Sequence, residues 1–170
     1  MENTLKELEN FHIDCIYGKK KHYNARDRLR AASRRLGNWI IGFSAATGTS
    51  AFATLAGVWD WLKIATAMLS VPTAVLAAIQ KNQNFHEQAE RHHVAANQYL
   101  VLAKEAQRWI AYANDGNITA EEIRDHLEKM SLKAAEIQKV EPETLPKDYE
   151  LARKGVDQGE EEYDEMNDES

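Results

Sequence analysis

Residues that could bind phosphate groups are concentrated in one segment near the N-terminus. Residues 19–35 include eight lysines and arginines against a single acid, Asp27, which gives a local net charge of +7. Such side chains donate charge-assisted hydrogen bonds to phosphate oxygens. The same bases would also attract anionic lipid headgroups and hold one side of a membrane span in the cytoplasm. The candidate nucleotide- or phosphate-binding residues are Lys19, Lys20, Lys21, Arg26, Arg28, Arg30, Arg34 and Arg35, with Arg91 and His92 further along the chain.

Other patterns that could support chemistry are weak. His86, Glu90 and His93 would share one helix face at the spacing i, i+4, i+7, which could hold a metal, but a solvated polar face explains them as well. The sequence G-F-S-A-A at 42–46 lacks the final glycine of a nucleophile elbow. The single cysteine, Cys15, falls on the apolar side of its helix, where packing is its expected role. We therefore expect no catalytic residues, no metal, no cofactor and no enzymatic activity.

Two long uncharged runs dominate the middle of the chain. Residues 36–59 carry no charge over 24 positions and residues 64–80 none over 17, although 28% of the chain is charged. As helices they would reach about 36 Å and 26 Å, against a hydrocarbon core of about 30 Å. Tryptophans at 59 and 61 flank Asp60 and suit a turn at the far interface. This predicts a transmembrane hairpin with both termini cytoplasmic; a cleaved signal peptide and a soluble core hairpin are the alternatives.

The first uncharged run is built mostly from small residues. Such residues let helices approach closely in lipid, and hydroxyls can bond between helices, so a homo-oligomer is expected. A hydroxyl-rich stripe could also face water in a pore, or could bond to carbonyls of its own helix and pack. The candidate pore-lining residues are Ser44, Thr47, Ala51, Thr54, Thr66, Ser70 and Thr73.

Amphipathic helices are expected on both sides of the hairpin. The apolar face at Phe85, Ala89, His92, Ala96, Tyr99, Ala103, Ala106 and Ile110 steps by four and three. It predicts a helix that continues from the second span, whereas Gly18 is expected to interrupt the N-terminal helix. Thr119 and Glu122 form a capping box before a further helix with Ile123, Leu127, Met130, Ala134 and Ile137 on its apolar face.

These features together predict an all-α membrane protein with four segments. Residues 1–35 form an N-terminal cytosolic helix with the basic juxtamembrane segment, 36–80 the transmembrane hairpin, and 81–156 cytosolic amphipathic helices. Residues 157–170 form an acidic disordered tail, because the last thirty residues contain twelve acids against three bases. The N- and C-terminal helices are expected to form one cytosolic helical bundle.

The chain resembles the SLATT family of small bacterial two-transmembrane effector domains. The resemblance rests on residues 17–35, the two-span hairpin and residues 85–110, above all the A-E-R-H run at 89–92 followed by Ala95, Ala96 and Tyr99. It covers roughly residues 5–156. The family has no agreed catalytic residues, so none are carried over.

The resemblance implies an antiphage effector that oligomerises in the bacterial inner membrane and permeabilises it when triggered. It also implies a ligand made by a partner nucleotidyltransferase, either a cyclic nucleotide or a DNA oligomer, which opens the pore or holds it shut. From another functional class, a non-conducting membrane adaptor that recruits a partner through its cytosolic helices remains the alternative.

Overall fold

The computed structural model describes residues 2–55, 57, 61–116 and 118–160, and over these residues the chain is helical with no strand. The helices are α1 (Glu2–Leu55), α2 (Trp61–Gln83), α3 (Phe85–Asn114), α4 (Ala120–Val140) and α5 (Pro146–Asp157). They fall into two compact units. One comprises residues 1–26 with 90–170, and the other comprises residues 27–89.

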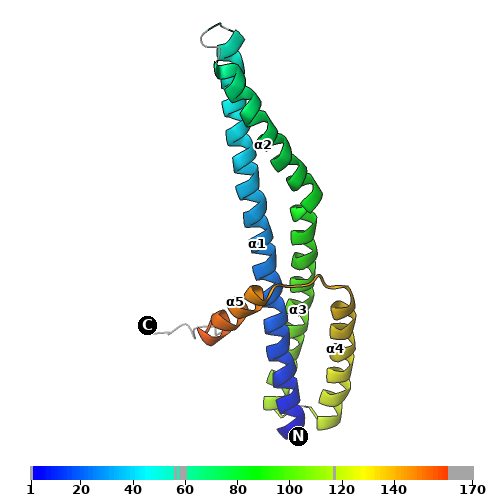
Figure 1. Ribbon diagram of the computed structural model, residues 1–170. Helices are drawn as coiled ribbons and strands as arrows, with labels where there is room; N and C mark the ends of the chain where they lie inside the picture. Colours follow the sequence, from blue (N-terminus) through cyan, green and yellow to red (C-terminus); the bar gives the residue numbers. More distant parts are fainter. Residues whose placement is uncertain (1, 56, 58–60, 117, 161–170) are drawn as a thin grey trace, which may run out of the picture. The chain divides into compact units, whose positions relative to one another are not determined.

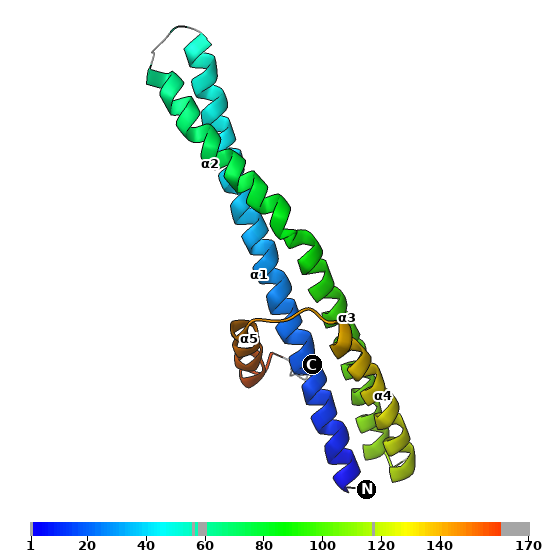
Figure 2. The ribbon, with the colours of Figure 1, turned by 45° about the vertical axis from the view of Figure 1, so that its right-hand side comes forward.

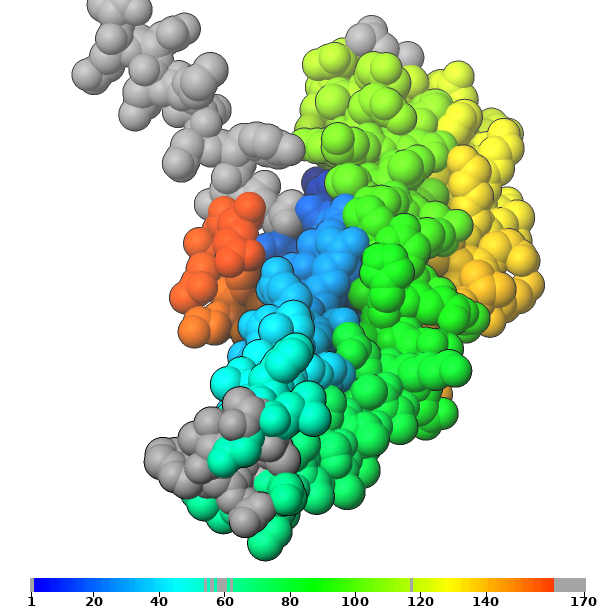
Figure 3. Space-filling model, turned by 90° about the horizontal axis from the view of Figure 1, so that it is seen from above, coloured from blue at the N-terminus to red at the C-terminus, as the bar shows by residue number. Residues whose placement is uncertain are grey.

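The first unit is a helical bundle with one apolar core. The N-terminal part of α1 and the whole of α4 both lie beside α3 (Figures 1 and 2), and all three helices contribute side chains to one core. Figure 3 shows α5, in orange, against the blue N-terminal part of α1. Side chains from three helices meet in the core, among them Leu8 of α1, Leu102 of α3 and Met130 of α4, all of them buried.

Local sequence signals explain where α4 and α5 begin. Thr119 accepts a hydrogen bond from the Glu122 backbone N–H, and the Glu122 carboxylate accepts one from the Thr119 backbone N–H, which completes the predicted capping box. The Thr119 hydroxyl also donates to the Glu122 carboxylate, and the two bonds that this carboxylate accepts, that from the backbone first, lower the pKa of Glu122. Pro146 stands at the first position of α5, where its missing N–H leaves no hydrogen bond unmade.

The predicted apolar faces of α3 and α4 are confirmed by burial. Along α3, the side chains from Ala89 to Ala106 on that face are all buried, His92 and Tyr99 included. Along α4, Ile123, Met130, Ala134 and Ile137 are buried and Leu127 packs against the core. The predicted packing role of Cys15 holds as well, because its side chain is buried in the same core.

Two boundaries differ from the prediction. Helix α1 runs without interruption through Gly18, because this glycine serves close packing: a Cβ there would lie 2.8 Å from the ring of Tyr99. The helix that was expected to continue from α2 into α3 is instead broken at Asn84, whose φ of 44° lies in the left-handed region. Asparagine tolerates that region better than most residues because its short side chain can bond locally.

The second unit pairs residues 27–55 of α1 with α2. The hydroxyl of Thr66 donates to that of Ser50 over 2.7 Å, which links the two helices directly. Among the described residues, the stretch Lys63–Asn114, which includes most of α2 and all of α3, contains an apolar segment long enough to cross a membrane, and none of that segment is buried. The proposed turn at Trp59 and Asp60 lies outside the described residues.

Candidate functional site

The basic residues of the first unit form a cleft where α5 meets α1. The cleft has a volume of about 430 Å³ and is lined by Lys19, Lys20, Tyr23 and Asn24 of α1 together with Leu151 and Glu160. Lys19 is 9% exposed and Lys20 8%. Ammonium groups so far from solvent require nearby anions or polar groups. Among the predicted basic candidates, these two lysines line this cleft, whereas Lys21 lines a separate cavity of about 430 Å³ beside Tyr99.

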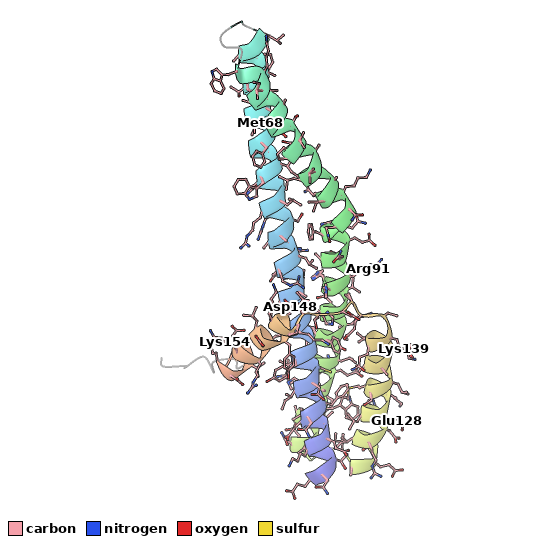
Figure 4. The ribbon with its side chains drawn as sticks, viewed as in Figure 1. Met68, Arg91, Glu128, Lys139, Asp148 and Lys154 are labelled. Atoms are coloured by element: carbon pink, nitrogen blue, oxygen red, sulfur yellow. The ribbon has the colours of Figure 1, made fainter. Side chains whose placement is uncertain are left out.

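Two contacts fix α5 against this part of α1. Asn24 donates from Nδ2 to the backbone carbonyl of Asp148 over 3.0 Å, and the rings of Tyr17 and Tyr149 stack with centroids 5.7 Å apart. Asp148 lies where α5 meets α1 (Figure 4) and is itself buried. Its carboxylate accepts a hydrogen bond from the Leu145 backbone N–H, which secures the start of α5. The cleft thus has rigid walls on the α1 side and at the beginning of α5.

A buried polar cluster lies in the same unit, and we call it the Glu141 cluster. It consists of Lys21, His22, His92, Tyr99 and Glu141, and joins α1, α3 and the segment after α4. Lys21 donates to Oε1 of Glu141 over 2.9 Å and the Tyr99 hydroxyl donates to Oε2 over 2.7 Å. Nδ1 of His22 lies 2.9 Å from Nδ1 of His92, so one imidazole donates and the other accepts.

The remaining nitrogen of His22 completes the cluster. Its Nε2 is 3.1 Å from Oε2 of Glu141, close enough for an ion pair, although this fully buried nitrogen makes no regular hydrogen bond there. A lone pair facing a carboxylate at that distance would be repelled, so Nε2 carries the proton. Nδ1 of a neutral His22 then accepts from His92. A doubly protonated His22 would donate instead.

The contacts within the cluster shift the pKa values of two of its members, Glu141 and Tyr99. Burial alone would raise the pKa of Glu141, but the contacts from His22, Lys21 and Tyr99 outweigh it and lower that pKa to about 2. Burial, together with the bond to Glu141, raises the pKa of Tyr99. Burial and then the neighbouring Asp14 raise the pKa of the Cys15 thiol to about 12, which keeps it a neutral packing group. Glu141 is therefore a fixed anion at neutral pH.

The other predicted phosphate ligands are distributed differently. Arg26 stacks over the ring of Tyr23, with its guanidinium carbon 4.6 Å from the ring centroid, and reaches Nδ1 of His93 over 3.3 Å. His92 is buried in the Glu141 cluster, and Lys21 is engaged there too. Arg91 is exposed on α3 (Figure 4). The remaining four bases, Arg28, Arg30, Arg34 and Arg35, belong to the second unit, where Arg28 is half-buried and the others are exposed.

The sequence pattern missed His22 and Glu141 as members of a site. A signal for His22 was present, because Leu8, Cys15, His22 and Leu29 step by seven and all four are buried. Glu141 comes directly after the last turn of α4 and carries no periodic signal of its own. Within the described residues, no group of three potential metal ligands is close enough to hold an ion, His86, Glu90 and His93 included.

The predicted pore-lining hydroxyls are mostly engaged with their own helices. Thr47 donates to the carbonyl of Phe43, Ser70 to that of Ala67 and Thr73 to that of Leu69, over 2.8–2.9 Å. Thr66 bonds to Ser50 on the facing helix. Ser44 is exposed and Ala51 half-buried. The side chain of Thr54 lies outside the described residues.

Comparison with known proteins identifies the family. The model of the SMODS and SLOG-associating 2TM effector domain family 4, a SLATT family, matches residues 5–169. The chain therefore belongs to the SLATT family, as its sequence motifs predicted. Searches of the curated proteins and of the solved structures each gave no match. The family and the membrane-capable helix together describe a membrane effector associated with nucleotide-signalling systems.

Proposed function

We propose that the chain is a pore-forming effector of bacterial antiphage defence, a homo-oligomeric inner-membrane channel gated by a nucleotide or oligonucleotide. The observation that carries this proposal is the apolar surface of the second unit. Its large side chains are exposed, among them Phe52 at 77%, Met68 at 71% and Val71 at 64%. Figure 4 labels Met68 on α2. A soluble protein rarely leaves so much contiguous apolar surface uncovered, so lipid and further copies of the chain are its expected neighbours.

The proposed topology rests on the charge pattern. Residues 19–35 precede the first apolar run and hold that side in the cytoplasm. Residues 36–59 and 64–80 then cross outward and back as a hairpin. The bond between Ser50 and Thr66 supports this pairing, because interhelical hydroxyl contacts are a common means of association in lipid. Both termini stay in the cytoplasm, where they can meet a soluble ligand.

Pore formation requires several hairpins, since two helices cannot enclose a channel. Hydroxyls that donate to their own carbonyls still present acceptor lone pairs to water, so Thr47, Ser70 and Thr73 remain compatible with a pore wall. Ser44 and Ala51, with Thr54 and Thr66, complete the proposed lining. The oligomer would place these faces around one axis.

Gating is proposed to act through the basic residues. A phosphate ligand bound by bases from one or more subunits would favour one state of a closed–open equilibrium, by as much as its affinity for the two states differs. The ligand is made by a partner nucleotidyltransferase, and it either opens the pore or holds it shut. Lys19 and Lys20, in a cleft between two helices, are the bases best placed to couple ligand binding to helix movement.

Dye release from liposomes tests conduction. The purified chain is reconstituted alone into vesicles loaded with a self-quenching dye, with and without cyclic dinucleotides and short DNA oligomers. A channel releases dye in at least one of these conditions without any other protein. A sealed vesicle in all of them, with the protein shown to be inserted and oligomeric, would contradict the proposal.

The arginines provide a test of ligand response. Replacing Arg26, Arg28 and Arg30 together by glutamine should abolish the effect of the active nucleotide on dye release while insertion is retained. The control replaces Arg108, Arg124 and Lys129, three exposed bases elsewhere on α3 and α4, by glutamine. An unchanged response in the first triple variant would show that these arginines take no part in ligand binding and would leave Lys19 and Lys20, which line the cleft, as the proposed bases.

A non-conducting adaptor is the second candidate, and one observation favours it. An apolar groove of about 570 Å³ lies between α3 and α4, lined by Val101, Leu102, Ile137 and Val140 with three polar neighbours. Val101 is 61% exposed and Val140 77%. A partner helix could lie there. Under this alternative the reconstituted protein binds its partner and the vesicles stay sealed.

A further inference from the structure

We propose that the cleft between α1 and α5 is a phosphate site whose internal occupant is the carboxylate of Glu160, so that a phosphate ligand binds by displacing the start of the acidic C-terminal segment. This inference rests on the proposed function for its ligand and goes beyond it by naming the site and its regulation. The ligand chemistry is a phosphate ester or anhydride, either of a soluble nucleotide or of a lipid headgroup.

The two partners in the cleft are unequally buried. Nζ of Lys20 lies 2.5 Å from Oε2 of Glu160, and the side chain of Lys20 is 10% exposed whereas that of Glu160 is 61% exposed. The ammonium is therefore part of the walls, and the carboxylate stands at the mouth of the cleft. Because Glu160 is the far more exposed of the two, its carboxylate is the member of the pair that an incoming anion can displace.

Gly155 makes the close approach feasible. A Cβ at this buried position on α5 would overlap with Oε2 of Glu160 and lie 2.9 Å from Nζ of Lys20. Any larger residue would push both charged groups away from the helix. The glycine therefore leaves open the space in which an anion meets Lys20.

The end of α5 aims Glu160 at this space. Gly159 has a φ of 77°, its N–H donates to the carbonyl of Val156, and the N–H of Glu160 donates to the carbonyl of Gly155. These two bonds and the left-handed glycine are those of a Schellman motif, which turns the chain back over its own helix. The position of Glu160 is thus set by backbone geometry as well as by charge.

A phosphate suits the cleft better than the carboxylate does. Lys19 also lines it, and a terminal phosphate carries about 1.5 to 2 negative charges and three acceptor oxygens against one charge and two oxygens for Glu160. The tethered carboxylate acts at an effective concentration in the millimolar range, on the order expected for a short linker. A weakly charged ligand would therefore lose the competition, and a ligand with several phosphates would win it.

Displacement of Glu160 would also change the electrostatics of the cleft. Six further acids occur in residues 161–169, directly after Glu160 in the sequence. A ligand that expels Glu160 breaks the ion pair between Lys20 and the residue that directly precedes these acids. Binding of a phosphate ligand would thus release Glu160 from Lys20 without requiring any change in the apolar core.

Binding of inorganic pyrophosphate to the full-length protein in detergent micelles, measured by isothermal titration calorimetry, tests the inference. Glu160→Gln should tighten pyrophosphate binding by about 5- to 10-fold, the effect of removing one competing ion pair of about 1 kcal/mol. Gly159→Val keeps every charge but makes the left-handed turn unfavourable, and should tighten binding in the same direction. Glu150→Gln, at an exposed position on α5 outside the cleft, removes the same charge and should change nothing.

Other results would overturn the inference. Equal tightening by Glu160→Gln and Glu150→Gln would mean that only overall charge matters, and unchanged or weaker binding in Glu160→Gln would mean that its carboxylate is no competitor. Lys20→Gln should weaken pyrophosphate binding at least about 10-fold, with circular dichroism confirming the fold, because it removes the charge-assisted bond. Retained affinity in Lys20→Gln would also contradict the site.

The two sources of phosphate and the two levels of the proposal can be separated. In nanodiscs, weaker pyrophosphate binding in phosphatidylglycerol than in phosphatidylcholine would assign the site to lipid headgroups, and equal binding would assign it to soluble phosphates. The channel proposal is tested independently by dye release. Competition by Glu160 with no dye release would support the phosphate site and contradict the channel. Dye release without such competition would support the channel and contradict the phosphate site.

Discussion

Glu141 shows how a single residue can hold several elements together. It comes after the last turn of α4, yet its carboxylate is bound by Lys21 of α1 and Tyr99 of α3 and faces His22. Its side chain is 16% exposed, so these bonds are only partly weakened by water. Removing the charge would leave the donors of two helices with a weaker, neutral acceptor in place of their common carboxylate.

Glu141→Gln should lower the free energy of unfolding by about 1–3 kcal/mol at pH 6, because bonds to a charged acceptor are replaced by weaker ones and one donor faces an amide N–H₂. The folded-state pKa of Glu141 is lowered to about 2 from an ordinary value of 4.5. The stability that it contributes is therefore fully present above about pH 4.5 and is lost as the pH falls toward 2. Chemical unfolding of the full chain in detergent, at pH 6 and pH 3, measures both values.

The difference between Glu141→Gln and the native protein should shrink at pH 3. Glu150→Gln, exposed on α5, serves as the matched control and should change neither value. A variant with native stability at pH 6 would show that the Glu141 cluster contributes nothing to the fold.

Gly18 is the second residue whose role depends on a neighbour in space. It lies inside α1, and the ring of Tyr99 occupies the position of its missing side chain, with three ring atoms 2.8–2.9 Å from an added Cβ. Gly18→Ala should destabilise the protein by about 1–3 kcal/mol, since a buried ring anchored to Glu141 cannot move aside freely. Thermal unfolding by circular dichroism would detect the change.

Gly42→Ala is the control for that experiment. An added Cβ at Gly42 meets nothing within 4 Å, so the substitution should be neutral or stabilise the helix by up to about 1 kcal/mol. If both alanine variants behaved alike, the contact between Gly18 and Tyr99 would have no energetic weight.

Among the elements, those with a repeating local signal could be predicted from the sequence. The apolar face of α3 and the capping box of α4 are determined by spacing within one helix. The break at Asn84 and the continuity through Gly18 were not predictable in this way, because each depends on one backbone conformation or one packed neighbour. Glycine in a helix pattern signals a break and a close approach equally well.

For the candidate site, the sequence predicted which residues are basic but not which of them lie together. The sequence indicated a basic segment. The residues that bind its members are 70 to 140 positions away in the chain, as in His22 with His92 and Lys20 with Glu160. Periodicity carries no information about such pairs. The fold therefore decides that Lys20 lines a cleft while Lys21 joins a buried cluster.

The groove between α3 and α4 leads to a prediction about assembly. Val101 lines this groove and is 61% exposed. If copies of the chain meet there, Val101→Asp should reduce the particle to smaller species, because a buried unpaired carboxylate opposes association. Light scattering coupled to size-exclusion chromatography in detergent measures the mass.

Leu132→Asp is the control, because Leu132 is similarly exposed but lies outside the groove, and this variant should keep the native mass. An unchanged mass in Val101→Asp would exclude the groove as an interface between copies.

At the scale of the whole molecule, the number of spans fixes where the two ends of the chain lie. Among the described residues one stretch is apolar enough to cross a membrane, whereas the family is a two-transmembrane one and residues 36–59 are uncharged. A single span would put the termini on opposite sides, and a hairpin would put both on the side of the basic segment, the cytoplasm. Fluorescent-protein and alkaline-phosphatase fusions at each terminus distinguish these cases, since the first reporter matures in the cytoplasm and the second outside it. We expect fluorescence and no phosphatase activity at both ends. An active phosphatase at one end would leave α2 as a lone span, with no hairpin from which a pore could be assembled.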